Sequence, residues 1–132
     1  MKAQCILLVD DDEDDQLLFL DAIREIDKSI ECCVANDGLE AILSLHTKSP
    51  VPDLIFLDLN MPKMNGYQCL AQIKKEMMFK EIPVVIYTTS RIESDRDRTL
   101  KMGASYFLTK PSDFSELIEE LTRILKLELK DK

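Results

Sequence analysis

Short apolar runs alternate with longer segments of mixed character along this chain. Five runs rich in Val, Ile and Leu have the length of buried strands, and their near-continuous apolar character is typical of strands covered on both faces. The segments between them repeat apolar residues every three or four positions, which is the period of an amphipathic helix. The predicted strands are residues 4–9, 30–35, 54–57, 83–87 and 105–109. The predicted helices are residues 14–26, 39–45, 66–75, 92–102 and a last one that begins after Ser112 or Asp113.

The helical period also predicts which residues of the first two helices face the core. In the first helix these are Leu17, Leu18, Ala22 and Ile26, and in the second they are Leu39, Ile42 and Leu43.

The order of the elements predicts the fold class. Five strand–helix units with short connections imply an α/β domain, in which a parallel sheet is covered by helices on both faces. The 132 residues are enough for one such domain with its own core. Because crossovers between parallel strands are right-handed, the carboxyl ends of all five strands meet at one edge of the sheet. Open α/β sheets bind ligands at this edge.

Five polar residues follow or end the predicted strands at this edge. Asp10 and Asp11 follow the first strand, Asp58 follows the third, Thr88 follows the fourth and Lys110 follows the fifth. Three carboxylates in one place cannot all stay ionised without a cation beside them. Lys110 is one such cation, and a hard divalent cation such as Mg²⁺ or Mn²⁺ is the other.

This set of groups points to phosphoryl transfer, which depends mainly on positioning and charge neutralisation. A carboxylate can act as the nucleophile and become an aspartyl phosphate, and Asp58 is the best candidate because it follows the central strand. Asp10 and Asp11 would hold the metal, while Lys110 and Thr88 would bind phosphoryl oxygens. Each residue alone has an ordinary alternative, as a helix cap, a strand-end hydroxyl or a solvated lysine.

Charge and composition exclude several classes of function. The net charge of −8 comes with no basic patch for a nucleic acid. The chain has no apolar run that could span a bilayer and no export signal, so we expect a cytoplasmic protein without a membrane partner. Excess acid is concentrated in residues 10–15, where Asp14 and Asp15 are expected to serve the start of the first helix through capping and the helix dipole.

The cysteines and the histidine offer little further chemistry. Cys5, Cys32, Cys33 and Cys69 have no C-x-x-C spacing, so we expect reduced, buried thiols rather than a metal site or a disulfide. His46 ends a helical segment and is expected to interact with the carboxyl end of that helix.

The whole chain resembles the receiver domain of bacterial two-component response regulators, in its CheY-like single-domain form. The resemblance rests on four motifs in the right order, each beside a predicted strand: Val9-Asp10-Asp11, Leu57-Asp58-Leu59-Asn60-Met61-Pro62 with Gly66, Thr88-Thr89, and Thr109-Lys110-Pro111. It implies a flavodoxin-like, doubly wound (βα)5 fold with a five-stranded parallel sheet in the order 2-1-3-4-5.

The resemblance also implies a role for each matching residue. Asp58 matches the phosphorylated aspartate and a metal ligand, Asp11 matches a direct metal ligand, and Asp10 matches a ligand that acts chiefly through water. The backbone carbonyl of Asn60 would complete the metal site. The residues that would hold the phosphoryl group are Thr88, Lys110 and, through its amide, Thr89. The bond before Pro111 would be cis, which an X–Pro bond permits.

Receivers couple phosphorylation to a hydroxyl at the end of the fourth strand and to an aromatic residue on the fifth. Thr88 matches the first switch position, and Phe107 rather than Tyr106 matches the second. Phe107 has no hydroxyl, so pointing outward would expose apolar surface without gaining a hydrogen bond. We therefore predict that it stays inward even without phosphate. The polar segment 91–101 is either a switching surface that moves at little cost or an ordinary solvated helix.

We expect a stand-alone receiver, one domain over residues 1–132 with no output domain. A sensor histidine kinase or a phosphotransfer protein would supply the phosphoryl group, and an unidentified downstream protein would read or receive it. The chain would catalyse only its own phosphorylation and dephosphorylation.

Two other functions and two contacts are left open. A phosphatase of the haloacid-dehalogenase type needs an acid where Asn60 stands, and a pure binding module would not need the intact acidic, hydroxyl and lysine positions. A homodimer through the last helix and a partner contact through Leu127 and Leu129 are the two contacts that the sequence leaves undecided.

Overall fold

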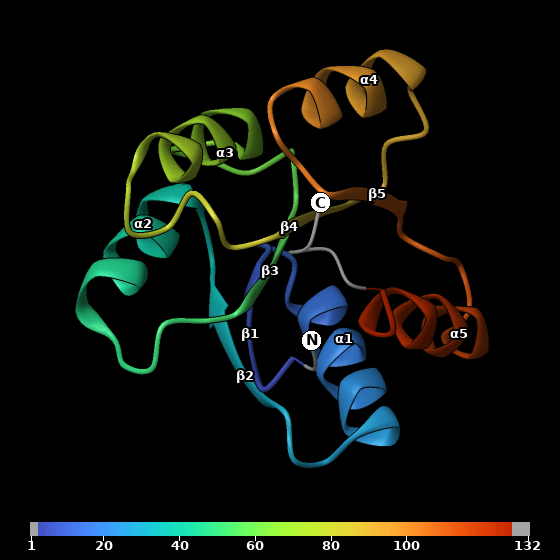
Figure 1. Ribbon diagram of the computed structural model, residues 1–132. Helices are drawn as coiled ribbons and strands as arrows, with labels where there is room; N and C mark the ends of the chain where they lie inside the picture. The colour runs from blue at the N-terminus through green and yellow to red at the C-terminus, as the bar shows by residue number, and fades with distance from the viewer. Residues whose placement is uncertain (1–2, 128–132) are drawn as a thin grey trace.

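Five parallel strands form one sheet in the order β2-β1-β3-β4-β5 in the computed structural model (Figure 1). The structure describes residues 3–127. The strands are β1 (Cys5–Val9), β2 (Glu31–Ala35), β3 (Leu54–Leu57), β4 (Val84–Thr88) and β5 (Tyr106–Thr109). The helices are α1 (Glu13–Ile26), α2 (Gly38–Thr47), α3 (Gly66–Lys75), α4 (Glu93–Lys101) and α5 (Phe114–Leu125). The flavodoxin-like fold and the strand order that the sequence predicted are confirmed.

Two layers of helices cover the sheet, α1 and α5 on one face and α2, α3 and α4 on the other (Figure 1). Alternate strand residues therefore enter different cores. Leu8 and Phe56 pack on the side of α1 and α5, whereas Leu7 and Ile55 pack on the opposite side. The ring of Phe19 in α1 lies 4.9 Å from that of Phe56. Each large apolar side chain buried in this way contributes about 1.5–3 kcal/mol, so the strands and their ends are rigidly held.

Side-chain caps define where four of the helices begin. The caps of α1, α2, α3 and α5 are Asp12, Asp37, Asn65 and Asp113. The last helix thus uses Asp113 rather than Ser112. Helix α4 differs, because Ile92 stands at its cap position and makes no side-chain hydrogen bond. Since a polar cap contributes about 1 kcal/mol, the start of α4 lacks a stabilisation that the other four helices have.

The predicted core face of α1 is partly wrong. The buried residues are Phe19, Ala22 and Ile23, whereas Leu17 and Leu18 are 62% and 46% exposed. In this leucine-rich segment a period of 3.6 residues fits two neighbouring stripes equally well. The stripe with Phe19, Ala22 and Ile23 is buried because the Phe19 ring packs against the sheet. The sequence pattern alone does not predict that contact.

The predicted core face of α2 is also partly wrong, since Leu39 and Leu43 are 52% and 62% exposed while Ala41 is buried. The amide of Gly38 donates a hydrogen bond to the carbonyl oxygen of Met64 at 3.0 Å. A Cβ atom at position 38 would lie 2.6 Å from that oxygen. This close approach between α2 and the loop before α3 turns the face with Gly38, Ala41 and Leu45 inward.

The peptide bond before Pro111 is trans, so the predicted cis bond there is wrong. Among residues 3–127 the one cis bond is Ser49–Pro50. The two isomers of an X–Pro bond differ by only about 0.5–1 kcal/mol, so the surrounding loop decides between them and a motif match does not.

The cysteine thiols are free, with Cys5 and Cys69 buried and Cys32 and Cys33 half-buried. Burial raises the pKa of the Cys69 thiol to about 12, so this side chain stays protonated and unreactive. His46 pairs with Glu76 across 2.8 Å in the last turn of α2.

No helix within the described part of the chain has the length and apolar character needed to cross a membrane. Leu127 is 39% exposed just after α5, and Leu129 of the predicted tail contact lies outside the described residues.

Candidate functional site

Asp10 and Asp58 lie side by side because the hydrogen-bond ladder of the sheet continues past two strand ends. The amide of Asp10 donates to the carbonyl of Ala35 and the amide of Asp58 donates to the carbonyl of Val9, each at 3.0 Å. Asp10 is fully buried and Asp58 is 7% exposed. Together with Asp11, which is exposed, they bring three carboxylate oxygens within 4.8 Å of one another. The predicted convergence of these acids at one edge is therefore present.

Local hydrogen bonds orient the two buried carboxylates. Oδ1 of Asp10 accepts from the amide of Asp12 at 3.0 Å, and Oδ1 of Asp58 accepts from the amide of Leu59 at 2.8 Å. Oδ2 of Asp10 is buried without a hydrogen bond. Burial raises the pKa of the Asp10 carboxyl, against the opposing effects of Lys110 and the Asp12 amide. This buried oxygen, which lies 2.8 Å from the Lys110 ammonium, forms with the two other carboxylates a donor set that fits a hard divalent cation.

Gly66 holds the loop between β3 and α3 against Asp58. Its amide donates to the carbonyl of Leu59 at 2.9 Å, and a Cβ atom at position 66 would lie 2.2 Å from the carbonyl oxygen of Asp58. Only glycine lets α3 begin this close to the end of the strand. Asn60, the predicted carbonyl ligand, lines a surface hollow of about 550 Å³ together with Asp11, so it lies beside the acids.

Lys110 extends from the end of β5 into the acidic cluster, and its side chain is only 8% exposed. Its Nζ atom lies 2.8 Å from Oδ2 of Asp10, 2.7 Å from Oδ2 of Asp15 and 3.5 Å from Oδ2 of Asp58. Burial disfavours the ammonium, but the carboxylates of Asp10 and Asp15 outweigh that effect and raise the pKa of Lys110. The lysine therefore stays charged and lies at the predicted edge.

Asp15 belongs to this cluster, although the sequence predicts only a helix-terminal role for it. Asp12 is the residue that caps α1, accepting a hydrogen bond from the amide of Asp15 at 3.0 Å. The Asp15 carboxylate instead accepts a hydrogen bond from Lys110 at 2.7 Å. Acidic residues are common in the first turn of any helix, so no signal in the sequence separates Asp15 from its neighbour Asp14, which is exposed.

The predicted hydroxyl and switch residues lie around the ends of β4 and β5. Thr88 is buried, and its hydroxyl accepts a hydrogen bond from the amide of Ser90 at 3.4 Å. Thr89 is exposed at the next position. The amide of Lys110 donates to the carbonyl of Thr88 at 2.7 Å, which keeps the two strand ends together. Phe107 is 8% exposed and packs in the core on the side of α2 and α3, the predicted inward placement. Its part in switching stays a prediction.

A side-chain network that the sequence analysis missed connects α4 to α3. The carboxylate of Asp95 accepts hydrogen bonds from the hydroxyls of Ser90, at 2.7 Å, and Tyr67. These two bonds lower the pKa of Asp95, and burial together with the Asp95 contact raises the pKa of Tyr67 to about 12. The Arg98 guanidinium lies 3.9 Å from the centroid of the Tyr67 ring. Because the Thr109 hydroxyl donates to the carbonyl of Ser90 at 2.8 Å, the network also reaches β5.

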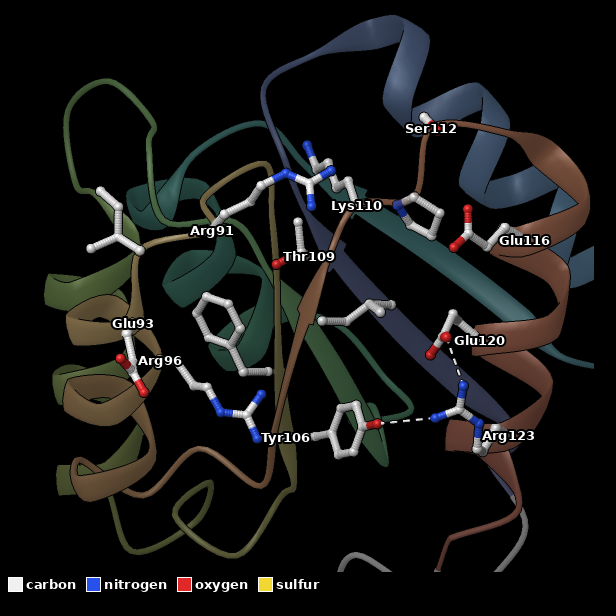
Figure 2. Close-up of a pocket in the computed structure, with 14 residues that line it drawn as sticks. Arg91, Glu93, Arg96, Tyr106, Thr109, Lys110, Ser112, Glu116, Glu120 and Arg123 are labelled. Atoms are coloured by element: carbon white, nitrogen blue, oxygen red, sulfur yellow. Dashed lines mark hydrogen bonds and ion pairs between the residues drawn. The ribbon is translucent and has the colours of Figure 1, made fainter.

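A groove of about 830 Å³ follows the open edge of β5 between α4 and α5 (Figure 2). Its charged lining includes Arg91, Arg96, Arg123, Glu93, Glu116 and Glu120. Figure 2 shows Arg123 between Glu120, at 2.6 Å, and the hydroxyl of Tyr106, at 3.4 Å. Lys110 and Phe107 also line the groove, so it adjoins the carboxylate cluster.

Comparison with known proteins gives one consistent family. The family model described as the response regulator receiver domain matches residues 6–122. The chain is 36% identical to the response regulator Rcp1 of Synechocystis sp. over 119 residues, which are 86% of this chain and 81% of that protein. The crystal structure of the Mn²⁺-bound form of Rcp1 has a TM-score of 0.84 and 34% identity, over 98% of this chain and 96% of that chain.

Two further relatives show the range of the match. The phosphorylated cyanobacterial phytochrome response regulator RcpA has a TM-score of 0.83 and 33% identity, over 92% of this chain and 90% of that chain. The sensor histidine kinase CheAY of Helicobacter pylori is 30% identical over 123 residues, which are 93% of this chain but 15% of that protein. The region that matches this chain is thus most of Rcp1 and of RcpA but a small part of CheAY.

Proposed function

Because this chain belongs to the response regulator receiver family, we propose that it accepts a phosphoryl group on Asp58 and signals through protein contacts that depend on that group. The donor is the phosphohistidine of a sensor histidine kinase or of a phosphotransfer protein. Receiver domains are regulators rather than classical enzymes, and the chemistry of this chain is limited to its own phosphorylation and dephosphorylation.

The observation that carries this proposal is the environment of the Asp58 carboxylate. Its Oδ1 atom is held by the amide of Leu59, while its Oδ2 atom faces the ammonium of Lys110 at 3.5 Å. Two further carboxylates lie within 4.8 Å. An acid with one fixed oxygen and one oxygen directed at a cation is suited to nucleophilic attack on an anionic phosphoryl donor.

The oxygen ligands in this cluster suit Mg²⁺ or Mn²⁺. Asp10, Asp11, Asp58 and the carbonyl of Asn60 would hold the cation, which would neutralise charge on the phosphoryl oxygens. The structure of Rcp1 with Mn²⁺ bound supports the same cofactor type for this chain.

In the proposed transfer an oxygen of Asp58 attacks the phosphorus of the donor in line. A P–O bond to Asp58 forms while the P–N bond to the donor histidine breaks, and the bonding electron pair stays on the imidazole nitrogen. Lys110 neutralises one phosphoryl oxygen, and the hydroxyl of Thr88 and the amide of Thr89 donate hydrogen bonds to others. In the separate dephosphorylation step water attacks the phosphorus, the P–O bond to Asp58 breaks, and inorganic phosphate and the free carboxylate are released.

The groove along β5 is the surface through which we propose that the phosphoryl group is read. Phe107 and Lys110 are among its lining residues, and Lys110 is labelled in Figure 2. Phosphorylation adds about −1.5 to −2 of charge beside Lys110, so the contacts of this lysine change at the same time. The reader is a downstream protein or a second copy of the chain that contacts α4, β5 and α5.

The test is intact-protein mass spectrometry after incubation with acetyl phosphate and Mg²⁺. We expect one phosphoryl group per chain, released by hydroxylamine as an acyl phosphate, and none in the Asp58→Ala variant or when a chelator replaces Mg²⁺. The Asp14→Asn variant, which removes an exposed acid nearby, serves as the matched control and is modified like the wild type.

Two results would overturn the proposal. Modification that persists in Asp58→Ala would place the phosphoryl group elsewhere. Multiple turnover of a simple phosphomonoester would instead identify a phosphatase, which the amide side chain of Asn60 disfavours because it cannot protonate a leaving group.

A further inference from the structure

Lys110 makes its shortest hydrogen bond with Asp15, not with the proposed nucleophile. The Nζ–Oδ2 distance is 2.7 Å to Asp15 and 3.5 Å to Asp58. Oδ2 of Asp10 lies 2.8 Å from the same ammonium but is left without a hydrogen bond. The carboxylate that takes the shortest hydrogen bond of Lys110 is therefore the one that matches no metal-binding or phosphoryl-binding position.

The position of Asp15 is fixed by the start of α1. Its amide donates to the capping side chain of Asp12 at 3.0 Å, and four positions further Phe19 is fully buried against Phe56. Its side chain is 30% exposed, so it stands on the solvent side of the buried ammonium. A carboxylate on a packed helix is a firm anchor for the flexible four-carbon stem of a lysine.

Two electrostatic consequences follow from this anchor. An ammonium next to a divalent cation repels it, and a carboxylate that neutralises the ammonium reduces the repulsion. Without Asp15, the ammonium would pair more closely with Asp58, which now lies 3.5 Å away, and would cover an oxygen that a cation or a phosphoryl donor needs.

We propose that Asp15 is a positioning residue that acts through Lys110. It holds the ammonium 3.5 Å from Oδ2 of Asp58 rather than in closer contact, and thereby keeps that oxygen open to a divalent cation. The inference rests on the metal-assisted phosphorylation proposed above, in which Lys110 contacts the phosphoryl group.

The test is isothermal titration calorimetry of Mg²⁺ binding to the unphosphorylated full chain, with no phosphodonor present. We expect Asp15→Asn to weaken Mg²⁺ binding by about tenfold. The variant loses one carboxylate charge near the site and leaves the Lys110 ammonium without the partner that neutralises it, and an effect of this order follows from those two changes. The matched control Asp14→Asn removes the same charge from the same helical turn without touching Lys110, and we expect a change of less than about twofold.

A double-mutant cycle shows whether Asp15 acts through the lysine. In a Lys110→Met background, Asp15→Asn should weaken Mg²⁺ binding no more than Asp14→Asn does. Asp15→Glu keeps a carboxylate within reach of the ammonium and should bind Mg²⁺ within about threefold of the wild type, since both the charge and the hydrogen bond remain.

A second readout follows Lys110 itself by ¹H–¹⁵N NMR of its ammonium group. The signal should have the same chemical shift in the wild type and in Asp14→Asn, and a different one in Asp15→Asn, because the ammonium then changes its partner. Equal Mg²⁺ affinities for Asp15→Asn and Asp14→Asn, an undiminished effect in the Lys110→Met background, or an unchanged ammonium signal would each overturn the proposal. Failure of Asp58 to accept phosphate would overturn the proposed function alone, because neither readout uses a phosphodonor.

Discussion

Replacing Gly66 by Ala should damage the site more than it damages the fold. The added Cβ atom would lie 2.2 Å from the carbonyl oxygen of Asp58 and 2.6 Å from Cα of Leu59. Both neighbours are backbone atoms, so no side chain can rotate to make room. Because real contacts of this kind stay beyond 3.0 Å, the start of α3 and the end of β3 must separate by about 0.8 Å.

The expected magnitude follows from this displacement. Overpacking of a tight contact costs about 1–3 kcal/mol of folding free energy, partly offset by up to about 1 kcal/mol because alanine favours helix more than glycine does. The rate of Asp58 phosphorylation should fall by about a hundredfold, since a 1 Å misplacement of a reacting group has an effect of that order.

Two measurements and one control variant test the expected effects of Gly66→Ala on stability and on the rate of phosphorylation. Urea denaturation gives the stability change, and the time course of the phosphoryl mass increment with acetyl phosphate gives the rate. Gly38→Ala is the control, because its Cβ atom would meet the carbonyl oxygen of Met64 at 2.6 Å, at a contact that does not include Asp58. It should lose stability but retain phosphorylation while folded. A Gly66→Ala protein with the stability and rate of the wild type would refute the argument.

Two further predictions concern the core and the link between α3 and α4. Phe19→Ala should lower the free energy of unfolding by about 3–5 kcal/mol, because the ring is fully buried against Phe56; a loss below about 1 kcal/mol in urea denaturation would contradict this packing. Tyr67 has its pKa raised from 10.0 to about 12 by burial and by the Asp95 hydrogen bond, so its stabilising contribution is present below pH 10 and is lost as the pH rises through about 12. Tyr67→Phe should lack this part of the alkaline loss in a series of urea titrations, and an identical alkaline loss in both proteins would exclude the assignment.

The fold and the central acids were predictable because they depend on chain order more than on detailed packing. Strands buried on both faces have an apolar pattern that needs no knowledge of neighbours. Once the strands are parallel, Asp10 and Asp58 must follow their strands at the same edge, and Lys110 must join them. These placements required only the sequence positions of the strand ends.

The parts that were missed depend on contacts between distant segments. Packing against the sheet decides which of two apolar stripes of α1 is buried. The local sequence around Leu17 and Leu18 does not show that they lie on the exposed stripe. Asp15 meets Lys110 across 95 positions, and Tyr67 meets Asp95 across 28. In each pair the residue type has a common local explanation, so its pattern carries no sign of the distant partner.

The missing side-chain cap of α4 and the network around Asp95 together determine how firmly this helix is attached to its neighbours. Helix α4 has one buried residue, Thr99, and no capping side chain at its start, so apolar packing contributes little to holding it. One carboxylate, that of Asp95, carries its bonds to both Ser90 and Tyr67. A displacement of α4 from α3 must break the Tyr67 bond, and a displacement of α4 from the loop after β4 must break the Ser90 bond. Two hydrogen bonds of a single side chain therefore hold this helix together with the Arg98 contact on the Tyr67 ring, and one substitution at Asp95 would weaken the attachment of α4 both to α3 and to the loop after β4.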